Sequence, residues 1–74
     1  MNMKYYITEN ELETEDGRLI PTYGIGAGGD CGTLAELRDV SVDPGFTGRV
    51  VDILNSNEVE LCHFRDVVLD ELNR

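Results

Sequence analysis

The first third of the chain alternates polar and apolar positions, as β-strands do. Two β-rich arms flank Asp16-Gly17, a pair that suits a two-residue type I′ turn because both residues tolerate positive φ. Such a turn pairs Glu15 with Arg18. In this register one face of the hairpin carries a row of glutamates, and the other face is apolar. The acidic face is Glu9, Glu11, Glu13 and Glu15, and the apolar face is Tyr6, Leu12, Leu19, Tyr23 and Ile25.

A glycine-rich segment, Gly24–Gly32, comes next, and we expect it to end the second strand and form a flexible connection. The following segment, Leu34–Val40, is compatible with a strand or a short helix. Thr33 and Glu36 fit the capping box of a helix. Residues 39–43, however, resemble the end of a strand that runs into a new helix. We favour a third strand.

The last third has the apolar spacing of two helices. Asp43 suits the N-cap and Pro44 the first position of a helix that ends at residues 55–57. A second helix is predicted over Leu61–Leu72. The short connection predicts an αα-hairpin packed on the sheet, with a core shared by Leu54, Phe64 and Val68. The predicted fold is therefore a single α+β domain over residues 1–74, with an N-terminal antiparallel β-hairpin and a third strand packed against a C-terminal αα-hairpin.

Composition limits the classes of partner. The chain has 74 residues and a net charge of −9, from 15 acidic and 6 basic residues. This charge repels phosphate, so we expect no direct binding to nucleic acid or to anionic membranes. A basic surface on another protein remains a permitted partner, although the acidity also serves solubility. A chain this short has a thin core, which partners or self-association often supplement.

The chain has only two cysteines, and its first 13 residues hold one lysine and no apolar run. These features argue against a disulfide scaffold, a signal peptide and a membrane span. We therefore expect a cytoplasmic protein with reduced thiols.

Four short segments resemble a family of short Firmicute proteins of unknown function. They are Tyr23-Gly24-Ile25, Leu37–Asp43, Asn57-Glu58-Val59 and His63–Asp70. This chain has Glu60-Leu61 where that family usually has Ser-Pro before its final helix. The resemblance implies a small bacterial cytoplasmic protein and supplies no activity.

Three groups of residues are of types that carry chemistry, but each also has a purely structural interpretation. Gly24-x-Gly26-x-x-Gly29 matches the dinucleotide fingerprint, but no βαβ unit surrounds it. Asp30, Cys31, Cys62 and His63 are metal-ligand types without the usual spacing. Cys62 and His63 are adjacent, so on a helix their side chains should diverge, which argues against a shared ion or a nucleophile–base pair. We therefore interpret Cys62 as a buried small hydrophobe.

We predict no catalytic, cofactor-binding or metal-binding residues, and we expect no enzyme. The favoured function is a protein-interaction module with an unknown protein partner, and a homodimer is a further expectation. One alternative is an acidic inhibitor or DNA mimic that binds a basic protein surface, and another is a small-ligand or metal-binding protein that uses the Gly24–Gly32 loop. The candidate interaction residues are Glu9, Glu11, Glu13, Asp66 and Asp70, and the candidate structural residues are His63 and Asp39.

Overall fold

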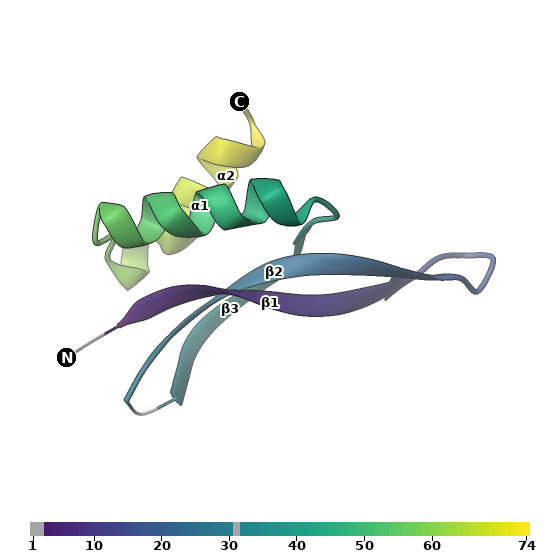
Figure 1. Cartoon of the computed structure of the whole chain (residues 1–74), viewed down its shortest axis with the longest axis horizontal. Coiled ribbons are helices and arrows are strands. Elements are labelled where there is room, and N and C mark those ends of the chain that lie inside the picture. The colour runs from purple at the N-terminus through teal and green to yellow at the C-terminus, as the bar shows by residue number, and fades with distance from the viewer. Residues whose placement is uncertain (1–2, 31) are drawn as a thin grey trace.

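A computed structural model describes residues 3–30 and 32–74. The sheet contains β1 (Lys4–Glu13), β2 (Leu19–Gly29) and β3 (Gly32–Ser41), antiparallel and in the order β1-β2-β3. Then follow α1 (Pro44–Ser56), a single 3₁₀ turn η1 (Leu61–His63) and α2 (Phe64–Leu72). Both helices lie over one face of the sheet, which we call the helix side; the other is the outer face (Figure 1). The α+β class and the third strand are confirmed.

The register of the first hairpin is one residue away from the predicted one. Thr14 N–H donates to the carbonyl of Arg18 (2.8 Å), and Gly17 N–H donates to the carbonyl of Thr14 (2.9 Å). Residues 14–17 thus form a turn that ends in Gly17 at φ +84°, the three-residue hairpin loop with a bulge rather than a two-residue turn. Glu13 now faces Leu19, and Glu9 faces Tyr23.

A shift of one residue exchanges the faces of one strand relative to the other. The sequence predicts Glu9, Glu11 and Glu13 on one face of the hairpin and Tyr23 and Ile25 on the other. This prediction is wrong, because all five residues are on the helix side. Tyr6 and Leu12, predicted to share the apolar face, lie on the outer face. The glutamates are nevertheless exposed, because the far end of the hairpin extends beyond the helices (Figure 1).

The glycine-rich segment is largely a strand, which corrects the predicted flexible connection. β2 continues to Gly29 as the central strand of the sheet. Ile25 and Ala27 point to the helix side and are fully buried, whereas Gly24, Gly26 and Gly28 alternate with them on the outer face. This places the fingerprint-like glycines inside an antiparallel sheet, and the next described element is strand β3 rather than the helix that holds the phosphate in a dinucleotide fingerprint.

The second pairing contains a pronounced bulge. Tyr23 faces Ser41 and Ile25 faces Leu37, so residues 38–40 of β3 lie opposite the single residue Gly24. Asp39 has φ +53°, which lies in the left-handed region that residues other than glycine rarely adopt. Its carboxylate accepts a hydrogen bond from the buried hydroxyl of Thr22. This bond ties the bulge to β2.

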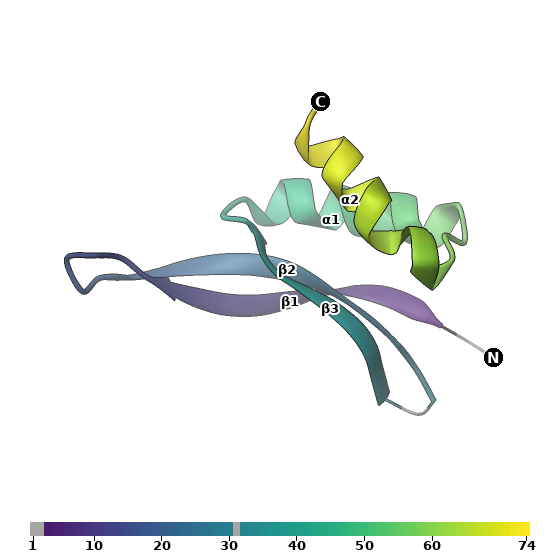
Figure 2. The same ribbon diagram turned by 180° about the vertical axis from the view of Figure 1, so that it is seen from behind.

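The predicted start of α1 is confirmed. The Asp43 carboxylate accepts a hydrogen bond from Gly45 N–H (2.9 Å), and Pro44 occupies the first turn. The second helix begins at Phe64, after the 3₁₀ turn, rather than at Leu61. The two helices do not form the predicted αα-hairpin, because α2 crosses α1 obliquely (Figure 2).

The core lies between the sheet and the two helices. Leu54, Phe64 and Val68 are at most 3% exposed, which agrees with the predicted core. They pack with Tyr5, Ile25, Ala27 and Val50. Full burial of one such aliphatic or aromatic side chain stabilises a fold by about 1.5–3 kcal/mol. The thin core thus depends on a few large contacts.

Candidate functional site

Tyr5 connects the start of β1 to three later parts of the chain. Its N–H donates to the Asn55 side-chain carbonyl (2.9 Å), and its C=O accepts from the Asn55 amide nitrogen (3.0 Å). Its hydroxyl donates to the carbonyl of Val59 (2.6 Å), and its ring lies 4.9 Å from that of Phe64. Burial raises the pKa of the Tyr5 hydroxyl, and the charge of Cys62 acts in the same direction. The Asn55 amide therefore acts as a one-residue strand partner for the edge of β1.

The two hydrogen bonds to Asn55 fix the direction of the backbone groups along β1. In an antiparallel pair, both backbone polar groups of a residue point to the same side, and this side alternates along the strand. The backbone N–H and C=O of Tyr5 point away from β2. By this alternation, the N–H and C=O groups of Ile7, Glu9, Glu11 and Glu13 also point away from β2. The bond from Thr14 N–H to Arg18 C=O follows the same alternation. Among the described residues, no hydrogen bond joins these outward backbone groups of residues 7–13 to another element.

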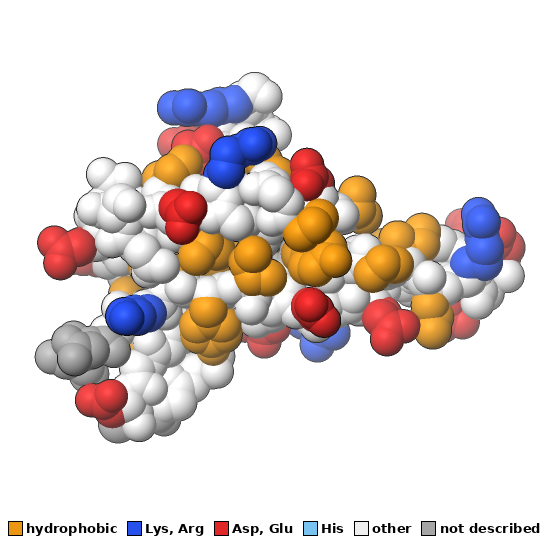
Figure 3. Space-filling model, in the orientation of Figure 1, with side chains coloured by type: hydrophobic (Ala, Val, Ile, Leu, Met, Phe, Trp, Pro, Cys, Tyr) orange, Lys and Arg blue, Asp and Glu red, His pale blue; other side chains and the backbone are white. Residues whose placement is uncertain are grey.

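We call residues 7–13 the β1 edge. Its glutamates Glu9, Glu11 and Glu13 are exposed and stand at every second position on the helix side. The side chains of Thr8, Asn10 and Leu12, which alternate with the glutamates, lie on the outer face of the sheet. Figure 3 shows acidic side chains below the helices and along the extended hairpin, with apolar side chains between them. The β1 edge thus combines unpaired backbone, regular negative charge and apolar surface.

An open cleft of about 570 Å³ lies beside this edge. Glu9, Asn10 and Glu11 of β1, residues 21–23 of β2, and Arg38 of β3 line it. β3 pairs with β2 only as far as Tyr23, so at Pro21 the only neighbour of β2 is β1. Proline is tolerated at such an edge position, because its missing N–H is not needed for pairing. The hairpin therefore extends from the domain with little cover on either edge.

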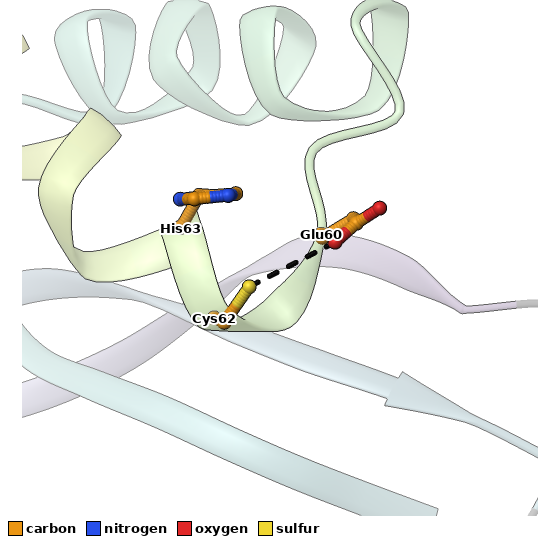
Figure 4. Close-up of side chains that lie close together, drawn as sticks. All are labelled: Glu60, Cys62 and His63. Atoms are coloured by element: carbon orange, nitrogen blue, oxygen red, sulfur yellow. Dashed lines mark hydrogen bonds between the residues drawn. The ribbon is translucent and has the colours of Figure 1, made fainter.

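A second cluster lies on the turn before α2. Glu60, Cys62 and His63 are exposed, and their potential ligand atoms all lie within 4.8 Å of one another. Figure 4 shows Glu60 and Cys62 joined by a hydrogen bond, Sγ to Oε2, of 3.8 Å. Cys62 is therefore not the buried hydrophobe that we expected. The side chains of Cys62 and His63 also do not diverge as expected, since their potential ligand atoms lie in one exposed cluster with that of Glu60.

The remaining candidates are scattered. Asp66 and Asp70 are exposed on α2, so they belong to a different element from the β1 edge and are distant from it in sequence. Asp39 belongs to the β3 bulge. Asp30 follows β2, and Cys31 lies outside the described residues. The structure therefore does not bring Asp30 into the cluster at Cys62 and His63.

Sequence reasoning missed the role of Asn55, which we had interpreted only as part of a helix end. Its contact with Tyr5 spans 50 residues, and no local pattern indicates it. Glu60 was likewise missed as a neighbour of Cys62. No helical period indicates this pair, because residues two apart point to different sides of an α-helix and of a 3₁₀ helix, and Glu60 lies in extended backbone before the turn.

Comparison with known proteins gives one family. The model of a family described as "Family of unknown function (DUF6514)" matches residues 1–74. No curated protein and no solved structure matches the chain. Within the described ranges, none of the helices has the length and apolar character that crossing a membrane requires.

Proposed function

Since the chain belongs to this family of unknown function, we propose from its own surface that it is a protein-interaction module that binds an extended basic segment of a partner protein along the β1 edge. The observation that supports this proposal is the row of outward backbone groups at Ile7, Glu9, Glu11 and Glu13. Extended peptides commonly bind by adding a strand to such an edge. The main chain supplies affinity, and alternate side chains supply specificity.

The geometry of an added strand defines the chemistry of the partner. A strand paired with β1 lies about 4.8 Å away, and its alternate side chains are about 6.6–7 Å apart. Side chains on the helix side of that strand stand beside Glu9, Glu11 and Glu13. Opposite charges on neighbouring strands stabilise the pair. The partner segment should therefore carry lysine or arginine at every second position.

A second copy of β1 is a poor occupant of this edge. Antiparallel pairing of two β1 strands would bring two glutamate rows together on one face, and like charges in cross-strand positions are destabilising. Charged residues on an edge strand also prevent aggregation. A basic partner relieves this repulsion, whereas a copy of the chain increases it.

The test uses a synthetic peptide of alternating lysine and threonine as the probe. Its control has the same composition with all lysines in one block, so that only the β-strand periodicity differs. Titration into isotope-labelled protein, followed by NMR, should shift the amides of residues 7–13. The alternating peptide should bind more tightly than the block peptide. Equal affinity for the two peptides would contradict the strand-addition geometry.

Matched variants separate charge from backbone pairing. Neutralising Glu9, Glu11 and Glu13 as glutamines should weaken binding about 3-fold to 150-fold, since each of the three exposed ion pairs contributes roughly 0.2–1 kcal/mol. The control triple variant Asp52→Asn, Asp66→Asn and Asp70→Asn removes the same charge elsewhere and should bind normally.

Glu11→Pro removes an outward N–H without breaking a bond to β2, so it should weaken binding more than Glu11→Gln does. If the Asp52/Asp66/Asp70 variant loses binding and the glutamine variant retains it, the partner surface is on the helices and the proposal is wrong.

A further inference from the structure

The turn between α1 and α2 holds three side chains that the proposed interaction at the β1 edge does not use. Glu60 offers a carboxylate, Cys62 a thiolate and His63 an imidazole. These are the three ligand types that zinc takes in proteins. From this cluster we propose a site for Zn²⁺, or a divalent ion of similar preference, with Glu60, Cys62 and His63 as ligands and one position open to solvent.

The distances fit a tetrahedral ion. With metal–sulfur bonds of about 2.3 Å and metal–nitrogen or metal–oxygen bonds of about 2.0–2.2 Å, neighbouring ligand atoms are roughly 3.4–3.6 Å apart. Sγ of Cys62 already lies 3.8 Å from Oε2 of Glu60, and all three potential ligand atoms lie within 4.8 Å. Small side-chain rotations therefore close the site. The metal takes the place of the thiol proton that now lies between sulfur and carboxylate.

The backbone under the cluster is fixed from both sides. His63 N–H donates to the carbonyl of Glu60 (2.9 Å), which closes the turn. Before the turn, the carbonyl of Val59 accepts the Tyr5 hydroxyl (2.6 Å), and after it Phe64 is buried in the core. Ligands on a fixed backbone lose little conformational freedom on binding a metal. The exposure of all three side chains leaves the path for the ion open.

Helical periodicity alone does not bring these three side chains together, because successive side chains diverge by about 100° in an α-helix and by about 120° in a 3₁₀ helix. The turn, however, is only three residues long, and Glu60 precedes it in extended backbone. In this chain Cys62 and His63 lie in η1 and Glu60 directly precedes it, and the three ligand atoms converge (Figure 4). The site therefore consists of a single short turn and needs no ligand from the sheet.

Cobalt substitution tests the site directly. The untagged protein, kept reduced with a phosphine rather than a thiol, is titrated with Co²⁺. We expect one ion per chain and a thiolate-to-cobalt charge-transfer band, which Zn²⁺ then removes by displacement. No band at millimolar Co²⁺, or a stoichiometry of one ion per two chains, would overturn the proposal.

The variants assign the ligands. Cys62→Ser should abolish the band, and the matched control Cys31→Ser should keep it; the reverse pattern would overturn the site. Glu60→Gln should lower Zn²⁺ affinity in calorimetry while the band remains, and an unchanged affinity would remove Glu60 from the site and overturn it as proposed. His63→Ala should lower the affinity as well. All three side chains are exposed, so an unchanged circular dichroism melt verifies that each variant folds.

Discussion

The ring of Tyr6 lies over Gly26 on the outer face of the sheet. A Cβ atom at residue 26 would be only 2.5 Å from Cε2 of that ring. The Tyr6 hydroxyl is hydrogen-bonded to the hydroxyl of Thr33 (2.8 Å), so the ring spans from β1 across β2 to β3. An aromatic side chain over a strand glycine covers backbone that would otherwise be bare.

Gly26→Ala should therefore destabilise the protein, because the added methyl group displaces the Tyr6 ring. Overpacking of this kind costs about 1–3 kcal/mol. The cost should fall in a Tyr6→Ala background, and chemical denaturation of the two single variants and the double variant measures the coupling. Gly48→Ala is the control, because its methyl group would meet Ile7 at an ordinary 3.7 Å in a helix that favours alanine. Equal costs of Gly26→Ala with and without the ring would contradict this packing.

Asn55→Ala should loosen the start of β1, because Tyr5 loses both partners of its outward backbone groups. Leaving partly buried polar groups unpaired costs about 1–3 kcal/mol. Hydrogen exchange at the Tyr5 amide should become faster, and the melting temperature should fall. Asn57→Ala, which removes one exposed hydrogen bond to Ile53, should have a smaller effect. Unchanged exchange at Tyr5 would mean that Asn55 does not hold the edge.

Phe64→Ala should cost about 3–5 kcal/mol, since it empties the position where α2 meets Tyr5 and the core. A domain of this size has little stability to lose, so the variant should be largely unfolded at room temperature. Leu69→Ala on the same helix is the control, because Leu69 is 44% exposed. A thermal melt of Phe64→Ala within a few degrees of the parent protein would refute the assignment.

Stability should fall at alkaline pH, in part through Tyr5. Burial raises the pKa of its hydroxyl, with Cys62 adding to the shift, so the folded state holds this proton more tightly than the unfolded state. The contribution is complete below the unfolded pKa of about 10 and is lost as pH rises from there through the folded pKa. Urea denaturation between about pH 8 and pH 11 should show a steeper decline for the parent than for Tyr5→Phe. Identical slopes would exclude Tyr5 as a cause.

The parts of the fold that could be predicted from sequence are those set by neighbouring residues. Asp43 and Pro44 specify the start of α1 because a cap bond and a fixed φ involve only the first turn. The spacing of Phe64 and Val68 likewise identifies the buried side of α2. These features need no knowledge of distant elements.

The register of the hairpin could not be predicted with the same security. Asp16-Gly17 fits both a two-residue turn and the observed three-residue loop, in which Gly17 alone has positive φ. The choice between them depends on Thr14 pairing with Arg18 and on Tyr5 reaching the core. That second condition involves Asn55 and Phe64, which are distant in sequence.

The candidate sites were predicted only in part. The glutamate row was identified as a surface, but its face and its position beside unpaired backbone follow from the register and from Asn55. The strand character of Gly24–Gly28 was hidden because glycine is the residue most typical of loops. The alternation of these glycines with Ile25 and Ala27 is the period-two pattern that could have revealed it.

The length of the loop between Thr14 and Arg18 has a consequence for how this hairpin can change during evolution. Deletion of one codon there cannot be absorbed by sliding β1 one position along β2, since that movement would turn either Tyr5 or Ile25 away from the helices. The lost residue must therefore be compensated by a change in the conformation of the loop itself, in which Gly17 already has a positive φ. Sliding by two residues, in contrast, keeps every side chain on its own face. Length changes that move the strands should therefore be inherited in pairs of codons, and single-codon changes should be confined to loops with a rebuilt turn.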